Sequence, residues 1–147
     1  MTEKLCRMTN QISVHPYFGY RDALAAMEWL AKSFGFETTM SFPDEQGGIA
    51  HAEMRLGDAV IIIFSDVDGY ERAPRKGDTT GLGMYLTLPG KAEVDTLHEQ
   101  AVGNGATSVY VPEETPWGNY RGRVIDLEGY EWSFGVHRPG EPQTQWD

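Results

Sequence analysis

The sequence contains very little cysteine and no long hydrophobic run. Cys6 is the single cysteine among 147 residues, which excludes an internal disulfide framework and fits the reducing cytosol. No apolar run reaches the roughly 20 residues that a membrane-spanning helix needs. Residues 1–10 also lack the apolar core of a signal peptide. A cytoplasmic protein that does not cross a membrane is therefore expected.

Basic residues are scarce as well. The chain has 12 lysines and arginines against 22 aspartates and glutamates, which gives a formal charge of −10. Nucleic acids and anionic membranes are therefore not expected as partners. Apolar residues are plentiful by comparison: 40% are hydrophobic and 12% aromatic, enough for the core of one domain or of two small packed modules.

Two common catalytic signatures are missing. Gly81-Leu82-Gly83 precedes a predicted strand instead of opening a helix, so it is not a phosphate-binding loop. Cys6 lies in a weakly patterned N-terminal stretch, and no Ser–His–Asp or Cys–His order supports nucleophilic catalysis. The arrangement of the strands is therefore the main indication of function.

The predicted elements occur in an order that repeats once. Asp22 is a helix cap and Gly35 a helix stop, and a second helix ends near Gly103–Gly105. Each half is predicted to contain one strand, one helix and three further strands in that order, which indicates a duplicated βαβββ unit. The predicted strands are 11–20, 36–42, 48–56, 59–65, 82–88, 106–111 and the two arms of the 117–135 hairpin, and the predicted helices are 22–35 and 90–102.

Side-chain patterns predict which faces are buried. Leu24, Met27, Ala31 and Phe34 form the expected inner stripe of the first helix, with Trp29 off that stripe. Val94, Leu97 and Ala101 form the stripe of the second helix. The strand 59–65 is apolar throughout and is expected to be buried on both faces.

The C-terminal hairpin has an apolar back and a charged front. Asp126–Gly129 is the predicted turn. Alternation around it places Val124 opposite Trp132 on the apolar face. On the other face the pairs are Arg123 with Ser133 and Ile125 with Glu131. A charged front of this kind suggests a sheet that lines a polar cavity.

These patterns predict an α+β fold of two tandem βαβββ modules whose curved sheets enclose a cavity. The first module spans 11–65 and the second 82–137. Residues 66–81 lack periodicity and form either a linker or a lid. Residues 1–10 and 138–147 are tails.

This organisation resembles the vicinal oxygen chelate superfamily, which includes glyoxalase I, bleomycin-resistance proteins and extradiol dioxygenases. The resemblance covers residues 11–137. It is carried by Tyr20-Arg21-Asp22 leading to Phe34-Gly35-Phe36, by the stretch 51–58, and by the hairpin 117–135. The hairpin turn has Leu127 and Glu128 in place of the usual Pro-Asp.

The resemblance implies four metal-ligand positions in the metal-using members, and they fall at His15, near Ile62, near Gly83 and at Ser133. Only His15 among them is a metal ligand of the expected kind, so the chain is nearest to the metal-free, bleomycin-resistance-like branch and no cofactor is expected. The alternative is one divalent metal ion on a rebuilt site of His15, His51 and Glu131.

The charged strand faces supply the candidate site residues. His15 and His51 are candidate catalytic acid–base groups, and Arg121 and Arg123 suit an anionic group of a ligand. Alternatively, the charged residues have no binding role and form a solvent-exposed strand face with cross-strand ion pairs. The candidate ligand-binding residues are His15, Tyr17, His51, Glu53, Arg55, Trp117, Tyr120, Arg121, Arg123, Glu131 and Ser133.

The expected function is binding of a small organic molecule, to sequester or carry an antibiotic or a metabolite. The resemblance also implies a homodimer with sites between modules of two subunits. The alternative is an enzyme of the same superfamily, either a metal-dependent lyase, isomerase or dioxygenase or a metal-free acid–base catalyst.

Overall fold

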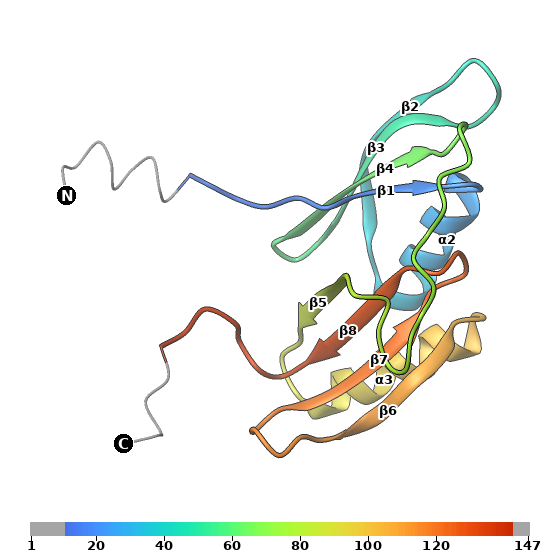
Figure 1. Cartoon of the computed structure of the whole chain (residues 1–147). Helices are drawn as coiled ribbons and strands as arrows, with labels where there is room; N and C mark the ends of the chain where they lie inside the picture. The colour runs from blue at the N-terminus through green and yellow to red at the C-terminus, as the bar shows by residue number, and fades with distance from the viewer. Residues whose placement is uncertain (1–10, 143–147) are drawn as a thin grey trace.

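Two copies of the βαβββ unit make up the fold in the computed structural model, which describes residues 11–142. The sheets have the strand orders β1-β4-β3-β2 and β5-β8-β7-β6 (Figure 1). This confirms the predicted α+β fold of two tandem modules. The first unit contains β1 (Tyr17–Tyr20), α2 (Ala23–Phe34), β2 (Glu37–Pro43), β3 (Ile49–Leu56) and β4 (Ala59–Ser65), and the second contains β5 (Gly83–Thr87), α3 (Lys91–Gly103), β6 (Thr107–Glu114), β7 (Tyr120–Ile125) and β8 (Glu131–Gly135).

The helix ends follow the sequence signals. Asp22 Oδ1 accepts a hydrogen bond from the Ala25 N–H at 3.0 Å, which confirms the N-cap. Gly35 adopts φ 90° and closes α2, a conformation that glycine reaches without steric cost. Neither helix among residues 11–142 is long and apolar enough to cross a bilayer.

The predicted inner stripe of α2 is wrong in part. Leu24 and Ala31 are exposed, whereas Trp29 and Leu30 are buried. The reason is that α2 has neighbours on two sides. One side packs on the first sheet, and on the other Phe34 contacts the second module, where its ring centroid lies 5.3 Å from that of Trp132. The α3 stripe of Val94, Leu97 and Ala101 is buried as predicted.

The first strand is shorter than predicted. It was expected to span 11–20, but β1 is Tyr17–Tyr20. Pro16 has no N–H to donate to a ladder, although its carbonyl still accepts from the Ile62 N–H at 3.0 Å. Before Pro16 the chain leaves the sheet (Figure 1), and Ile12 and Val14 are exposed.

The expectation that β4 is buried on both faces is also wrong. Ile61 and Ile63 belong to the core, whereas Ile62 and Phe64 are only half-buried. We call the side of the first sheet that bears Ile62 and Phe64 the open face of sheet 1, because the opposite side carries the core residues packed with α2. Its alternating positions also include Tyr17, His51, Glu53, Arg55 and Val60.

The hairpin register is as predicted. Arg123 pairs with Ser133, Val124 with Trp132, and Ile125 with Glu131. The core face of this sheet packs on α3, and the opposite side is the open face of sheet 2. Its alternating positions include Tyr85, Tyr110, Arg121, Arg123, Glu131 and Ser133.

The hairpin turn of the second module also joins the two modules. Asp126 Oδ2 accepts from the Tyr20 hydroxyl at 2.6 Å and from Trp132 Nε1 at 3.1 Å. The Glu128 carboxylate accepts from the backbone N–H groups of Arg21 and Asp22, at 2.6 and 2.9 Å. A carboxylate at this end of α2 satisfies free N–H groups and opposes the helix dipole. These bonds fix how the two open faces are oriented.

Candidate ligand-binding site

The open face of sheet 1 is apolar with one polar pair. Tyr17 and Phe64 have ring centroids 6.0 Å apart, and Ile62 lies beside them. His51 Nε2 and Glu53 Oε2 are 2.7 Å apart on the same side of β3. The carboxylate therefore orients the imidazole, in an arrangement suited to proton transfer. Arg55 follows on the same side and is exposed.

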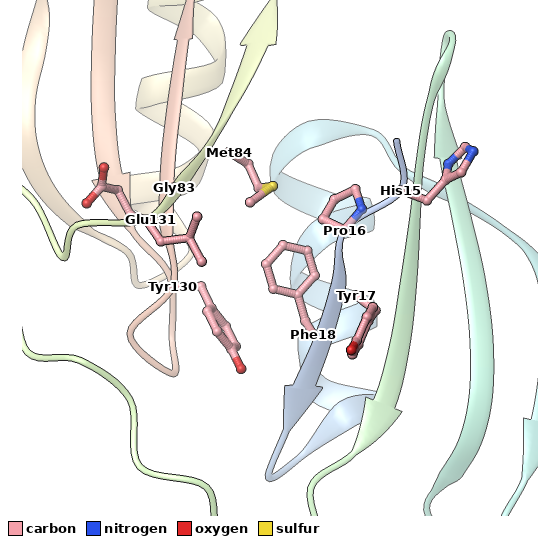
Figure 2. A pocket seen from close by; sticks show the side chains of 9 residues that line it. His15, Pro16, Tyr17, Phe18, Gly83, Met84, Tyr130 and Glu131 are labelled. Atoms are coloured by element: carbon pink, nitrogen blue, oxygen red, sulfur yellow. The ribbon is translucent and has the colours of Figure 1, made fainter. Parts of the chain in front are cut away.

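His15 lies before β1 at the margin of this face. Its Nε2 is 2.6 Å from Ser13 Oγ, and its Nδ1 is 3.1 Å from the Val60 carbonyl oxygen. Figure 2 shows the ring pointing away from Phe18 and Met84. Both ring nitrogens thus have partners within the first module.

The open face of sheet 2 carries a cluster of two arginines around a tyrosine. The Arg121 guanidinium carbon lies 3.9 Å from the Tyr110 ring centroid, and that of Arg123 lies 5.1 Å from it. Arg121 Nη1 is 3.7 Å from a Glu113 oxygen and is buried without a hydrogen-bond partner. We call Tyr110, Arg121 and Arg123 the arginine–tyrosine cluster.

Arg123 has further partners on the same face. Its Nε donates to Ser133 Oγ at 2.7 Å, and its Nη1 donates to the Asp78 carbonyl at 2.6 Å. The Glu131 carboxylate lies 3.6 Å from the same Nε. Arg123 therefore places a cation directly over Ser133.

Glu131 is buried and bonded to the segment that connects the modules. Its carboxylate accepts from Thr79 Oγ1 at 2.9 Å and from the Thr80 N–H at 2.6 Å. It also lies over Gly83, where an added Cβ would come within 2.7 Å of Glu131 Oε2. Glu131 thus anchors the 66–81 segment to sheet 2.

The start of the 66–81 segment is fixed by Asp66. Its carboxylate accepts from the N–H groups of Asp68, Gly69 and Tyr70 at 2.7–3.1 Å, and Arg72 lies 3.6 Å away. Burial alone would raise the pKa of the Asp66 carboxyl, but these donors and Arg72 hold it below its usual value. The segment is therefore tied down at both ends, by Asp66 and by Glu131.

A lowered carboxyl pKa makes stability depend on pH. Asp66 stabilises the fold above the unfolded-state pKa of about 4, and this contribution is lost as the pH falls through the lower pKa of the folded state. We expect Asp66→Asn to lower the free energy of unfolding at pH 7 and to flatten its decline below about pH 4. Urea unfolding across this range measures both. Asp68→Asn is the control, because Asp68 is exposed; equal curves for the two variants would contradict the assignment.

The remaining candidates lie apart from the two open faces. The Tyr120 hydroxyl donates to Asp95 of α3 at 2.5 Å, so this side chain lies on the helix side of sheet 2. Trp117 is exposed in the turn before β7, with its ring 5.5 Å from that of His137. The structure does not bring Tyr120 to the arginine–tyrosine cluster.

Neither set of expected metal ligands fits a divalent ion within one chain. Ile62 donates nothing, the space over Gly83 is filled by Glu131, and Ser133 binds the Arg123 guanidinium. In the rebuilt set, His51 is bonded to Glu53, and Glu131 to Thr79 and Thr80. No group of three or more His, Cys, Asp or Glu side chains in residues 11–142 is placed to hold a metal ion.

A cavity of about 310 Å³ lies between the edges of the two sheets. Figure 2 shows Phe18 and Met84 turned toward it, with Tyr130 beside them and Tyr17 on the other side of β1. The Tyr130 hydroxyl donates to the Gly19 carbonyl at 2.8 Å. The cavity is mainly apolar and offers space for a hydrophobic group. Its lining residues are His15, Pro16, Tyr17, Phe18, Leu82, Gly83, Met84, Tyr130 and Glu131.

Sequence reasoning missed Tyr110, Asp78 and the apolar residues of sheet 1. Alternation along β6 does not reveal Tyr110, because a register shift between Ser108 and Tyr110 brings it opposite Arg123. Asp78 was not detectable either, because a segment without periodicity gives no indication of which sheet it covers.

The chain is similar to known proteins over most of its length. The model of the Glyoxalase/Bleomycin resistance protein/Dioxygenase superfamily matches residues 13–134. An uncharacterised protein of Mycobacterium tuberculosis (strain H37Rv) is 28% identical over 127 residues, which cover 84% of this chain and 73% of the relative.

Two solved structures illustrate the likeness in fold. TioX from Micromonospora sp. ML1 is 26% identical with a TM-score of 0.65, over 86% of this chain and 100% of TioX. A lactoylglutathione lyase from Agrobacterium tumefaciens is 20% identical with a TM-score of 0.58, over 84% and 92% of the two chains. The lyase shares the fold, which does not by itself carry an activity. With its two βαβββ modules and the family match over residues 13–134, the chain belongs to the Glyoxalase/Bleomycin resistance protein/Dioxygenase superfamily.

Proposed function

We propose that the protein binds a small organic molecule without a metal ion and sequesters or carries it, as an antibiotic- or metabolite-binding member of its superfamily. The observation that carries this proposal is the Arg123–Ser133 contact at 2.7 Å. A serine under a guanidinium stands at the position where the metal-using members are expected to have a ligand. Such a site suits an oxygen-rich or anionic group, because a guanidinium donates several hydrogen bonds in a plane.

The site is proposed to form between two copies of the chain. Ile62 and Phe64 leave an apolar surface half-open on sheet 1, and Tyr17 beside them is 70% exposed. A contiguous apolar surface on a soluble chain marks a binding or subunit interface. In a homodimer the open face of sheet 1 of one copy would lie over the arginine–tyrosine cluster of the other. The apolar face would then contact the apolar part of the ligand, and the arginine–tyrosine cluster would bind its polar end.

A second candidate function is metal-free acid–base catalysis. The observation that favours it is the His51–Glu53 pair, whose side chains are 2.7 Å apart and partly accessible. In the site between two copies, His51 of one copy would take a proton from the bound molecule while Arg123 of the other stabilises the resulting anion. Turnover that His51→Gln abolishes while ligand binding is kept would select this alternative over sequestration.

The proposal is tested by a thermal-shift screen of aromatic carboxylates, amines and neutral analogues, with and without EDTA. A ligand that binds only the folded protein is expected to raise the melting temperature by several degrees at 100 times its Kd, equally in both buffers. Sedimentation is expected to show a dimer. Stoichiometric metal in the purified protein, together with loss of the ligand-induced shift in EDTA, would contradict the proposal.

A further inference from the structure

The loop from Lys76 to Gly81, which we call the Asp78 turn, lies over the arginine–tyrosine cluster. We propose that this turn is a lid whose Asp78 carboxylate takes the place of a ligand carboxylate, so that the natural ligand is an organic carboxylate that displaces it. This inference rests on the proposed binding function and names the class of its ligand. It also explains why a segment of the intermodule connection crosses a sheet face (Figure 1).

Asp78 contacts two members of the arginine–tyrosine cluster, one of them through its carboxylate. The Tyr110 hydroxyl donates to its carboxylate, and Arg123 Nη1 donates to its backbone carbonyl at 2.6 Å. These two donors face the same side of sheet 2, because Tyr110 and Arg123 pair across β6 and β7. The chain thus supplies its own anion to the group of side chains that would bind one.

The charges around the cluster do not favour a second anion while Asp78 is in place. Two guanidinium groups, those of Arg121 and Arg123, lie 3.7 Å from Glu113 and 3.6 Å from Glu131, and the Asp78 carboxylate accepts from Tyr110 between them on the same face. A ligand carboxylate would be the fourth anion beside two cations, and like charges at such separations repel. Displacement of Asp78 removes one of them.

The cluster also keeps a donor that Asp78 does not satisfy. Arg121 Nη1 is buried and has no hydrogen-bond partner. A buried donor without an acceptor is costly, and the Asp78 turn offers it none. A carboxylate that is free to orient itself can accept from Tyr110 and from an arginine together, since each of its oxygens accepts more than one bond. The additional hydrogen bond to an arginine would therefore favour replacement of Asp78 by the ligand carboxylate.

The turn is built as a small unit that can be displaced. Gly77 and Gly81 flank its tip with φ of 66° and 91°, and a Cβ added to either would meet nothing within 4 Å. Lys76 N–H donates to the Thr79 carbonyl at 2.9 Å, which keeps the tip closed on itself. Thr79 and Thr80 remain tied to Glu131, so only the Asp78 contacts need to break.

The test measures the binding of 2-naphthoate and of neutral 2-naphthamide, which has the same ring, by fluorescence titration of the full chain. If the free cluster is open about a tenth of the time, Asp78→Ala is expected to bind naphthoate about tenfold more tightly than the natural chain. Naphthamide binding is expected to stay the same, because the neutral amide does not replace the Asp78 carboxylate and so does not require the open cluster. Asp68→Ala is the matched control: it removes an equal charge from an exposed position of the same segment and is expected to leave both affinities unchanged.

Each outcome of the titration either supports or overturns the proposed lid. Tighter naphthoate binding by Asp78→Ala alone supports the lid. Equal naphthoate affinities of the natural chain and Asp78→Ala overturn it while leaving the proposed binding function intact. Equal gains in Asp78→Ala and Asp68→Ala show only a general charge effect and overturn it too. Absence of naphthoate binding by every variant overturns the carboxylate assignment, and the thermal-shift screen then judges the binding function separately.

Discussion

Asp126→Ala is expected to lower the free energy of unfolding by about 3–5 kcal/mol, the largest loss for any single substitution considered. The side chain accepts from the Tyr20 hydroxyl and Trp132 Nε1 through one oxygen. Through the other it accepts from the backbone N–H groups of Glu128 and Tyr130, each at 3.0 Å. Alanine leaves these donors without their acceptor in the joint between the modules, where unmet hydrogen bonds are costly.

Urea unfolding of three variants separates this effect from simple loss of contacts. Tyr20→Phe removes one of the four bonds and is expected to cost about 1–2 kcal/mol. Leu127→Ala changes the neighbouring turn residue, whose side chain is half exposed, and is expected to cost less than about 1 kcal/mol. An Asp126→Ala variant as stable as Leu127→Ala would show that the turn does not join the modules.

Arg123→Gln is expected to weaken binding of 2-naphthoate by about 30- to 100-fold. Glutamine retains a donor for Ser133 but removes the cation that the proposed ligand needs. Naphthamide binding is expected to change little, because a neutral ligand gains less from the guanidinium. Urea unfolding is the accompanying measurement, since Arg123 also contacts Glu131 and Asp78.

Arg138→Gln provides the matched control for that titration. It removes the same charge from an exposed position that follows the end of β8. Its naphthoate affinity is expected to equal that of the natural chain. If Arg123→Gln and Arg138→Gln bind naphthoate equally well, the cluster is not the anion site.

The register of the last hairpin could be predicted because its turn is local. Asp126 and Gly129 fix the turn, and strict alternation then assigns Arg123 and Ser133 to one side. The length of β1 was harder to predict, because the apolar residues Ile12 and Val14 continue the alternating pattern beyond Pro16. Only the geometry of the sheet shows that the ladder ends there.

The candidate site was predicted as one set of residues, whereas the structure divides most of it between two faces. His51 and Glu53 lie on the open face of sheet 1, and Arg123 and Ser133 on that of sheet 2. Alternation determines the side of a strand, but it does not determine which sheet faces which. The hydrogen bonds of Glu131 to Thr79 and Thr80 were unpredictable for a related reason: these partners lie in the 66–81 segment, which has no periodic pattern.

We propose that each ligand site combines sheet 1 of one copy with sheet 2 of another. Phe64→Ala impairs one face and Arg123→Gln the other, so each variant alone is expected to bind 2-naphthoate weakly. After unfolding and refolding together in equal amounts, about a quarter of all sites should be intact, since half of the dimers are mixed and each has one unaltered pair of faces. Naphthoate titration of the mixture is therefore expected to recover tight binding at about a quarter of the sites. A mixture that binds no better than the two separate variants would contradict the claim.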